Sequence, residues 1–143
     1  MDEQLEIALK GGDFKHLIES RFTRIKKNYN LKKVEIEVLY FLSNCKDKNT
    51  PTDIYKKLGL NRGHVSQAID SLYRRKLIIA VPDQNDRRYM HYSVSDDAVE
   101  IIEEIAEIKK ELDKQIFRGI TEEEIIAYKK TTEKIIRNIQ QLL

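Results

Sequence analysis

The sequence predicts a mainly helical α+β fold in which several helices accompany one β-hairpin. Only five glycines and two prolines occur among 143 residues, against 19 isoleucines, which disfavours a many-stranded sandwich or barrel. Apolar residues recur at helical spacing along most of the chain, except between residues 77 and 94. With 41% apolar residues, a chain of this length can bury one core.

Helical structure is expected before and after a glycine pair near the N-terminus. Residues 2–10 are prone to form helix, and Gly11 and Gly12 indicate a break with Asp13 as the next N-cap. Apolar residues at helical spacing then continue to about Tyr29. We therefore expect either one kinked helix or two short ones before residue 30.

A second helix is predicted over residues 34–44, and Cys45 extends its apolar stripe. A single cysteine excludes an intrachain disulfide and any zinc site built from several cysteines. We expect Cys45 to be a small core residue, with a redox sensor as the alternative.

Two short helices joined by a tight turn are predicted next. Thr50 is the expected N-cap of the first, with Pro51 at its first position and Gly59 as a C-cap glycine. Asn61 is expected to cap a helix that runs to about Lys76. Its buried stripe consists of Val65, Ile69 and Leu72. Two helices in this arrangement form a helix-turn-helix pattern.

The apolar pattern changes its period after residue 76. A β-branched run over residues 77–82 and an extended run over 89–94 flank the six polar residues 83–88. This arrangement predicts a β-hairpin with a charged tip. A helix-turn-helix followed by a hairpin is a winged helix, and its second helix can enter the major groove of DNA.

Two long amphipathic helices complete the chain. Ser95 is expected to cap the first, Gly119 to break it, and Thr121 with Glu124 to form the capping box of the second. Eleven isoleucines in residues 96–143 widen the stripes beyond one packing face, so we expect a homodimer to bury them, with a larger intramolecular core as the alternative. The last helix is expected to bury Ile125, Tyr128, Ile135, Ile139 and Leu142.

Charge is segregated along the chain. The net charge is +4 over residues 51–92 and −4 over residues 93–143, as expected when one segment meets a polyanion. We therefore assign residues 31–95 to a DNA-binding winged-helix region. Residues 1–30 and 96–143 are assigned to a helical dimerisation region, and the two regions form one integrated domain.

The outer faces of the second helix of the pair are the predicted DNA-reading surface. They carry Arg62, Gly63, His64, Ser66, Gln67 and Asp70. Arginine pairs bidentately with guanine and glutamine with adenine, and a glycine allows close approach of the backbone. An ordinary solvated face is the alternative. The predicted DNA-binding set also includes Thr50, Arg74 and Arg75, although the two arginines could equally complement the helix dipole.

The hairpin tip carries Arg87 and Arg88. There they are expected to reach the minor groove, whose negative potential attracts arginine. A charged turn that only improves solubility is the alternative.

Several of these residues recur together in a known family. They are the Leu58-Gly59-Leu60-Asn61 turn, Val65-Ser66 with Asp70 and Leu72, the Pro82-Asp83 to Asp86-Arg87-Arg88 wing, and Val94-Ser95. The stretch from Thr50 to Glu104 resembles the MarR family of bacterial winged-helix regulators. The resemblance implies a homodimer on pseudo-palindromic double-stranded DNA, typically a repressor released by a small phenolic or lipophilic ligand.

The resemblance also implies residue roles. Arg88 would enter the minor groove and pair with Asp70 to brace the wing. Base reading would fall to Arg62, His64 and Gln67. With Asp70 we count Asp86 among the wing-bracing residues.

An effector is expected to bind between the dimerisation helices and the winged helix. His16, Tyr29 and Tyr40 are candidate lining residues because of their helix positions. In the alternative, the two tyrosines pack the core and keep their hydroxyls at its edge.

Other functions find little support in the sequence. No histidine pair has metal-ligand spacing, and no catalytic Ser-His-Asp or Cys-His pattern or phosphate-binding glycine loop occurs, so no metal, cofactor or enzymatic activity is expected. No signal peptide or long apolar run occurs, so a cytoplasmic protein is expected. The competing hypothesis is a winged helix used as a protein-interaction or architectural module without sequence-specific regulation, and a small enzyme is a weaker one.

Overall fold

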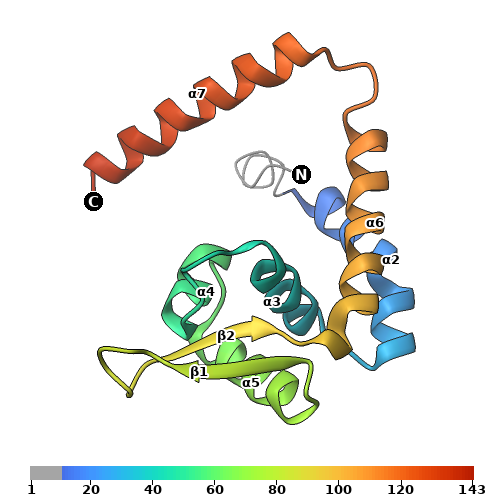
Figure 1. Ribbon diagram of the computed structural model, residues 1–143. Helices are drawn as coiled ribbons and strands as arrows, with labels where there is room; N and C mark the ends of the chain where they lie inside the picture. Colours follow the sequence, from blue (N-terminus) through green and yellow to red (C-terminus); the bar gives the residue numbers. More distant parts are fainter. Residues whose placement is uncertain (1–10) are drawn as a thin grey trace. The chain divides into compact units, whose positions relative to one another are not determined.

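The computed structural model describes residues 11–143, which fall into two compact units (Figure 1). One unit is the continuous run Phe22–Glu107, and the other contains residues 11–21 and 108–143. Helices α2 (Gly12–Tyr29) and α6 (Val99–Ile116) each contribute to both units. The helix predicted over residues 2–10 lies outside the described residues.

The larger unit is a winged helix. Its elements after α2 are α3 (Lys33–Asn44), α4 (Pro51–Leu58), α5 (Arg62–Arg74), β1 (Ile78–Pro82), β2 (Met90–Val94), the 3-10 helix η1 (Asp96–Ala98) and the start of α6. Strands β1 and β2 pair antiparallel, from Ile78 opposite Val94 to Pro82 opposite Met90. They lie beside α3 and α5, and the loop at their tip projects beyond the helices (Figure 1). The predicted mainly helical fold with one hairpin is thus confirmed.

A single core supports this unit. Its largest fully buried side chains come from each α-helix of the unit and from β1, and include Ile25, Leu39, Ile54, Leu72, Ile78 and Ile105. Burying a side chain of this size contributes about 1.5–3 kcal/mol, so these contacts hold the wing and the helix pair on one frame.

Helix caps fix the ends of α4 and α5 as predicted. The Thr50 hydroxyl accepts from the Asp53 amide at 3.3 Å, and the Asp53 carboxylate accepts from the Thr50 amide at 3.2 Å. Gly59 ends α4 with φ of +62°. The Asn61 amide oxygen accepts from the backbone amides of Gly63 and His64 at the start of α5.

Some local expectations were wrong. Asp13 lies in the first turn of α2, which begins at Gly12, and so does not cap it. Ser95 occupies the N-cap position of η1, but its hydroxyl donates instead to the Lys76 carbonyl at 2.6 Å. Lys76 has φ of +60°, so α5 ends at Arg74 and the freed carbonyl attracts the hydroxyl.

Cys45 is not within the apolar stripe of a helix. It is the half-buried C-cap residue of α3, and its thiol lies 3.5 Å from the Leu42 carbonyl. Partial burial raises the pKa of the Cys45 thiol, which lowers its thiolate content and hence its reactivity.

The second unit contains α7 (Glu122–Gln141), with the predicted capping box between Thr121 and Glu124 and the predicted break at Gly119, where φ is +80°. The expected burial of its apolar residues was wrong. Ile135 and Ile139 are 53% and 51% exposed, and Leu142 is 86% exposed. Ile125 and Tyr128 are half-buried. Among the described residues of α7 only Thr132 is buried, because the single chain leaves the apolar face of this helix largely uncovered.

Candidate nucleic-acid interface

The outward face of α5 is exposed along its whole length. Its members are Arg62, Gly63, His64, Ser66, Gln67 and Asp70, all exposed as the sequence predicts. The opposite face buries Val65, Ile69 and Leu72, and also Ala68, which the sequence analysis did not include. We call this exposed set the recognition face.

The first turn of α5 is arranged around its cap. A Cβ at Gly63 would lie 3.1 Å from the Asn61 amide oxygen that caps the helix, so a glycine here keeps the cap uncrowded. The guanidinium carbon of Arg62 lies 5.8 Å from the centroid of the Tyr55 ring on α4, within the range of a cation–π contact. Arg62 is therefore oriented by the preceding helix.

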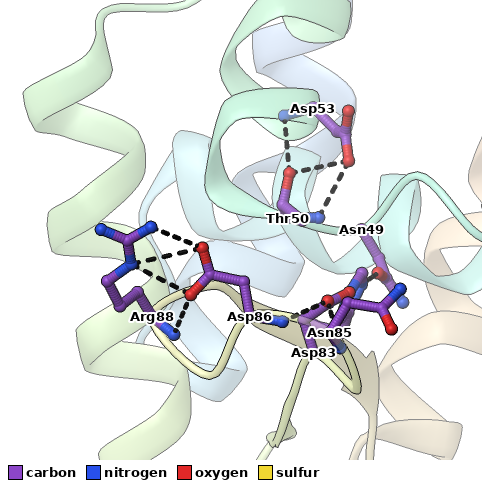
Figure 2. Close-up of polar contacts among 8 residues, drawn as sticks. Asn49, Thr50, Asp53, Asp83, Asn85, Asp86 and Arg88 are labelled. Carbon is purple, nitrogen blue, oxygen red and sulfur yellow. Dashed lines mark hydrogen bonds and ion pairs between the residues drawn. The ribbon is translucent and has the colours of Figure 1, made fainter.

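Thr50 has its polar groups engaged within the cap of α4. Its hydroxyl donates to the Asp53 carboxylate at 2.7 Å and accepts from the Asp53 amide, as Figure 2 shows. The side chain is half-buried, and the observed contacts are those of a helix cap.

The two neighbouring arginines at the end of α5 differ in their contacts. Arg74 is exposed, and its Nε lies 3.4 Å from the Asp70 carbonyl within the same helix. Arg75 donates to the backbone carbonyls of Tyr29 and Asn30, where α2 ends. These contacts complement the end of α2 and test neither role predicted for Arg75, which concerned phosphate and the end of α5 itself.

The wing tip is closed by an ion pair different from the one expected. Arg88 Nη2 donates to Asp86 Oδ2 at 2.8 Å and its Nε to Oδ1 at 3.0 Å (Figure 2). The expected pair between Arg88 and Asp70 is absent from the described residues, because the neighbouring carboxylate in the same turn already engages the guanidinium. The pair lowers the pKa of the Asp86 carboxyl and raises that of Arg88. Arg87 is exposed at the same tip.

The end of the strand pairing next to the wing tip contains a cluster that no sequence pattern indicated. His91 Nε2 lies 2.7 Å from Asp83 Oδ1, and its Nδ1 lies 2.5 Å from Asn49 Oδ1. The other Asp83 oxygen accepts from the amides of Asn85 and Asp86. The hydrogen bond from His91 is the largest cause of the lowered pKa of Asp83, followed by those two amides. A histidine on β2, one residue from the end of the strand pairing, was the available signal.

Two shallow clefts lie beside the wing and α5. One, of about 360 Å³, lies between the α3–α4 loop and the wing and is lined by Lys46, Asp47, Asn49, Val81, Pro82, Asp83, Gln84, Asn85 and His91. The other, of about 330 Å³, lies between α3 and α5 and is lined by Lys32, Val34, Glu35, His64, Gln67, Ala68 and Ser71. Two predicted base-reading residues, His64 and Gln67, therefore border the second cleft.

The candidate effector residues are distributed over both units. His16 is exposed in the unit formed by residues 11–21 and 108–143, whereas Tyr29 and Tyr40 are half-buried in the winged-helix unit. The Tyr29 hydroxyl donates to Glu104 Oε1 at 2.6 Å. An effector pocket stays a prediction.

The described residues hold no group of three or more His, Cys, Asp or Glu side chains placed to bind a metal ion. None of the helices within residues 11–143 is long and apolar enough to cross a membrane.

The fold and the exposed α5 define the class of winged helix-turn-helix proteins. Solved structures of low sequence identity share this fold. Staphylococcus aureus MepR in its DNA-binding conformation matches with a TM-score of 0.76 at 21% identity, over 88% of this chain and 93% of that one. The MarR protein of Peptoclostridium difficile matches at 0.75 and 20% identity, over 95% and 88%. Streptococcus pneumoniae FabT, solved in complex with DNA, matches at 0.70 and 20% identity, over 99% and 100%.

A family model for the transcriptional regulators SarA/Rot matches residues 20–105, which is more than half of the chain. The protein belongs to this family of transcriptional regulators. The predicted resemblance to winged-helix regulators is confirmed, and the matched range contains the helix pair and the wing.

Proposed function

We propose that the protein is a homodimeric transcriptional repressor that binds a pseudo-palindromic site on double-stranded DNA. The observation that carries the proposal is the recognition face, a row of exposed polar and basic side chains on a helix whose other face is buried. Such a helix fits the major groove, about 12 Å wide. The DNA complexes of MepR and FabT, which share the fold, support the same reading.

Residue roles within the proposed interface follow from the contacts. Arg62 and Gln67 are proposed to read bases with His64 and Ser66, and Gly63 to allow close approach of the backbone. Arg74 is exposed and is proposed to contact phosphate, and the exposed Arg87 is proposed to reach the minor groove. Arg88 is proposed to enter the minor groove while Asp86 holds its guanidinium at the wing tip. Thr50 is proposed to bring the N-terminus of α4 to the DNA backbone, where helix amides favour phosphate.

Binding to DNA from the region upstream of the protein's own coding sequence tests the proposal. A Gln67→Ala variant should lose about 1–3 kcal/mol on the preferred site and little on random DNA, because a bidentate base contact is removed. Gln140→Ala, an exposed change at the end of α7, is the matched control. Fluorescence anisotropy on both DNAs measures the difference. Equal weakening on the two DNAs would show that Gln67 contacts phosphate.

The finer features of the regulator are part of the same proposal. A dimer is supported by the exposed isoleucines of α7. Release by a small phenolic or lipophilic effector, with His16, Tyr29 and Tyr40 near its site, is proposed from the sequence, as are a cytoplasmic location and the lack of catalytic activity. A panel of phenolic compounds in thermal-shift measurements tests the effector, and stabilisation of Tyr40→Phe equal to that of wild type would exclude the Tyr40 hydroxyl from its site.

A further inference from the structure

Four helices of the winged-helix unit meet at one set of polar contacts. We call this set the Tyr29 junction, and it consists of Tyr29, Asn30, Glu35, Arg75 and Glu104. All five residues lie in the continuous run Phe22–Glu107. Arg75 belongs to the predicted DNA-binding set, but its guanidinium is engaged at the end of α2, and the other four residues are not among the predicted DNA contacts.

Arg75 joins the end of α5 to the end of α2. Its Nη1 donates to the Asn30 carbonyl at 3.0 Å, and its Nη2 donates to the Tyr29 carbonyl. Carbonyls at a helix C-terminus lack partners within the helix and carry partial negative charge. The forked guanidinium satisfies two of them at once, which a lysine ammonium cannot do with the same geometry.

Glu35 joins α3 to the same part of α5. The residue is 3% exposed. Its Oε2 accepts from the Ser71 hydroxyl at 2.8 Å and lies 4.0 Å from Arg75 Nη1, while its Oε1 accepts from the Lys32 amide at 2.9 Å. Ser71 and Arg75 are one helical turn apart, so a buried carboxylate contacts α5 at two successive turns. Buried charges held in this way tolerate little displacement of their partners.

Tyr29 extends the contacts to α6. Its hydroxyl donates to Glu104 Oε1 at 2.6 Å, while its backbone carbonyl accepts from Arg75. One residue therefore contacts both α6 and the end of the recognition helix. Helices α2 and α6 are also the two helices that contribute to both units of the chain.

We propose that Tyr29, Arg75 and Glu104 are positioning residues that select the spacing between DNA half-sites without contacting DNA. The inference rests on the proposed function, in which the helices of the second unit pair with those of another copy. The angle between α5 and the helices α2 and α6 then determines how far apart two recognition helices lie. Half-sites on one face of DNA are about one helical turn apart, so a small change in that angle alters which spacing fits.

The test uses a DNA site selected by the wild-type protein from a randomised library, together with versions lengthened or shortened by one base pair at the centre. Wild type should prefer the selected spacing by about tenfold or more, because the recognition helices are held at a fixed separation. Tyr29→Phe, which removes the donating hydroxyl, should lower this preference to about twofold while keeping the fold. Glu104→Gln, whose amide oxygen can still accept, should lower it less. Glu103→Gln, an exposed neighbour on α6, is the matched control and should keep the wild-type preference.

The salt dependence of binding separates positioning from phosphate contact. Arg74→Gln should lower the log–log salt slope by about one, because an exposed cation is lost. Arg75→Gln should leave the slope unchanged and weaken the spacing preference. Circular dichroism melts establish that each variant folds, and Tyr29→Phe, which keeps the aromatic ring, carries the test where Arg75→Gln does not fold.

The outcomes are distinct. Wild-type spacing preference in both Tyr29→Phe and Glu104→Gln overturns the inference, and so does a reduced salt slope in Arg75→Gln. A wild-type protein that binds DNA without any spacing preference overturns the inference and leaves DNA binding standing. A wild-type protein that selects no DNA from the library overturns the proposed function itself, and the inference with it.

Discussion

Asp83 contacts three groups in the wing turn with one carboxylate. One oxygen contacts His91, and the other accepts from the amides of Asn85 and Asp86. His91 in turn contacts Asn49 in the loop before α4. Both ring nitrogens of His91 therefore face a side-chain oxygen, one on Asp83 and one on Asn49. The wing turn and the start of α4 are therefore linked through one histidine.

Acid should loosen this turn. The pKa of Asp83 is lowered in the folded protein, so the contribution of its ionised form is present above the ordinary carboxyl range, near pH 4, and is lost as the pH falls through the lowered pKa. We expect the Asn85 and Asp86 amide signals in NMR spectra to shift with a midpoint below that range. Asp83→Asn should abolish the shift, and Asp47→Asn, on the same cleft, should not. A midpoint at the ordinary value for aspartate would contradict the prediction.

Tyr29 should ionise only in strong base. The carboxylate of Glu104 raises the pKa of the Tyr29 phenol to about 12. The stability that this hydrogen bond adds is therefore fully present just below the ordinary pKa of 10.0 and is lost as the pH rises through the raised one. Ultraviolet titration of wild type minus Tyr29→Phe measures the single group. Glu104→Gln should return the phenol towards its ordinary pKa, and an unchanged titration would exclude this carboxylate as the cause.

At the scale of elements, the N-terminal end of α5 depends on its cap for stability. Asn61 satisfies two amides of the first turn. Asn61→Ala should cost about 1 kcal/mol of unfolding free energy, because both amides lose their acceptor. Asn61→Asp is the matched rescue, since aspartate caps as well as asparagine. Chemical denaturation measures both, and equal losses in the two variants would argue against the cap.

Sequence patterns predicted the elements better than the contacts between them. Apolar spacing and local caps are encoded within a few residues, which is why Thr50, Gly59 and Asn61 marked the ends of α4 and the start of α5 correctly. Contacts between distant segments have no such local signal. The link from Arg75 to the end of α2 spans 45 residues or more of sequence, and it becomes visible only when the helices are packed.

For the candidate site, the exposed face of α5 could be predicted from the sequence, but the contacts of the wing could not. The recognition face consists of the residues of α5 that lie outside its buried apolar stripe. Its exposure could therefore be predicted from the helical period alone. The partner of Arg88 could not be predicted in this way. The sequence offers two candidate carboxylates, Asp70 and Asp86, and only the geometry of the turn brings Asp86 to the guanidinium. Asn49 and His91 carried no family pattern and were missed.

At the scale of the whole molecule, the exposed apolar face of α7 predicts association. Ile135 and Ile139 are each about half exposed, although isoleucine favours burial. Light scattering should give about 34 kDa, twice the 16.9 kDa of one chain. The double change Ile135→Glu and Ile139→Glu should give a monomer, and Lys134→Glu should leave the mass unchanged. A wild-type mass near 17 kDa at micromolar concentration would contradict the predicted dimer.

The division of the chain into units also has a consequence for biosynthesis. The winged-helix unit is one uninterrupted run, Phe22–Glu107, so all of its contacts are available once that stretch has left the ribosome. The other unit joins residues 11–21 to residues 108–143, and its first segment must wait until residues 22–107 have been translated before its partner segment begins. Since domains fold as they emerge, the surface proposed to read DNA is expected to form before the helices proposed to pair two copies. A nascent chain would then fold its winged-helix unit first, and the proposed dimer would form last.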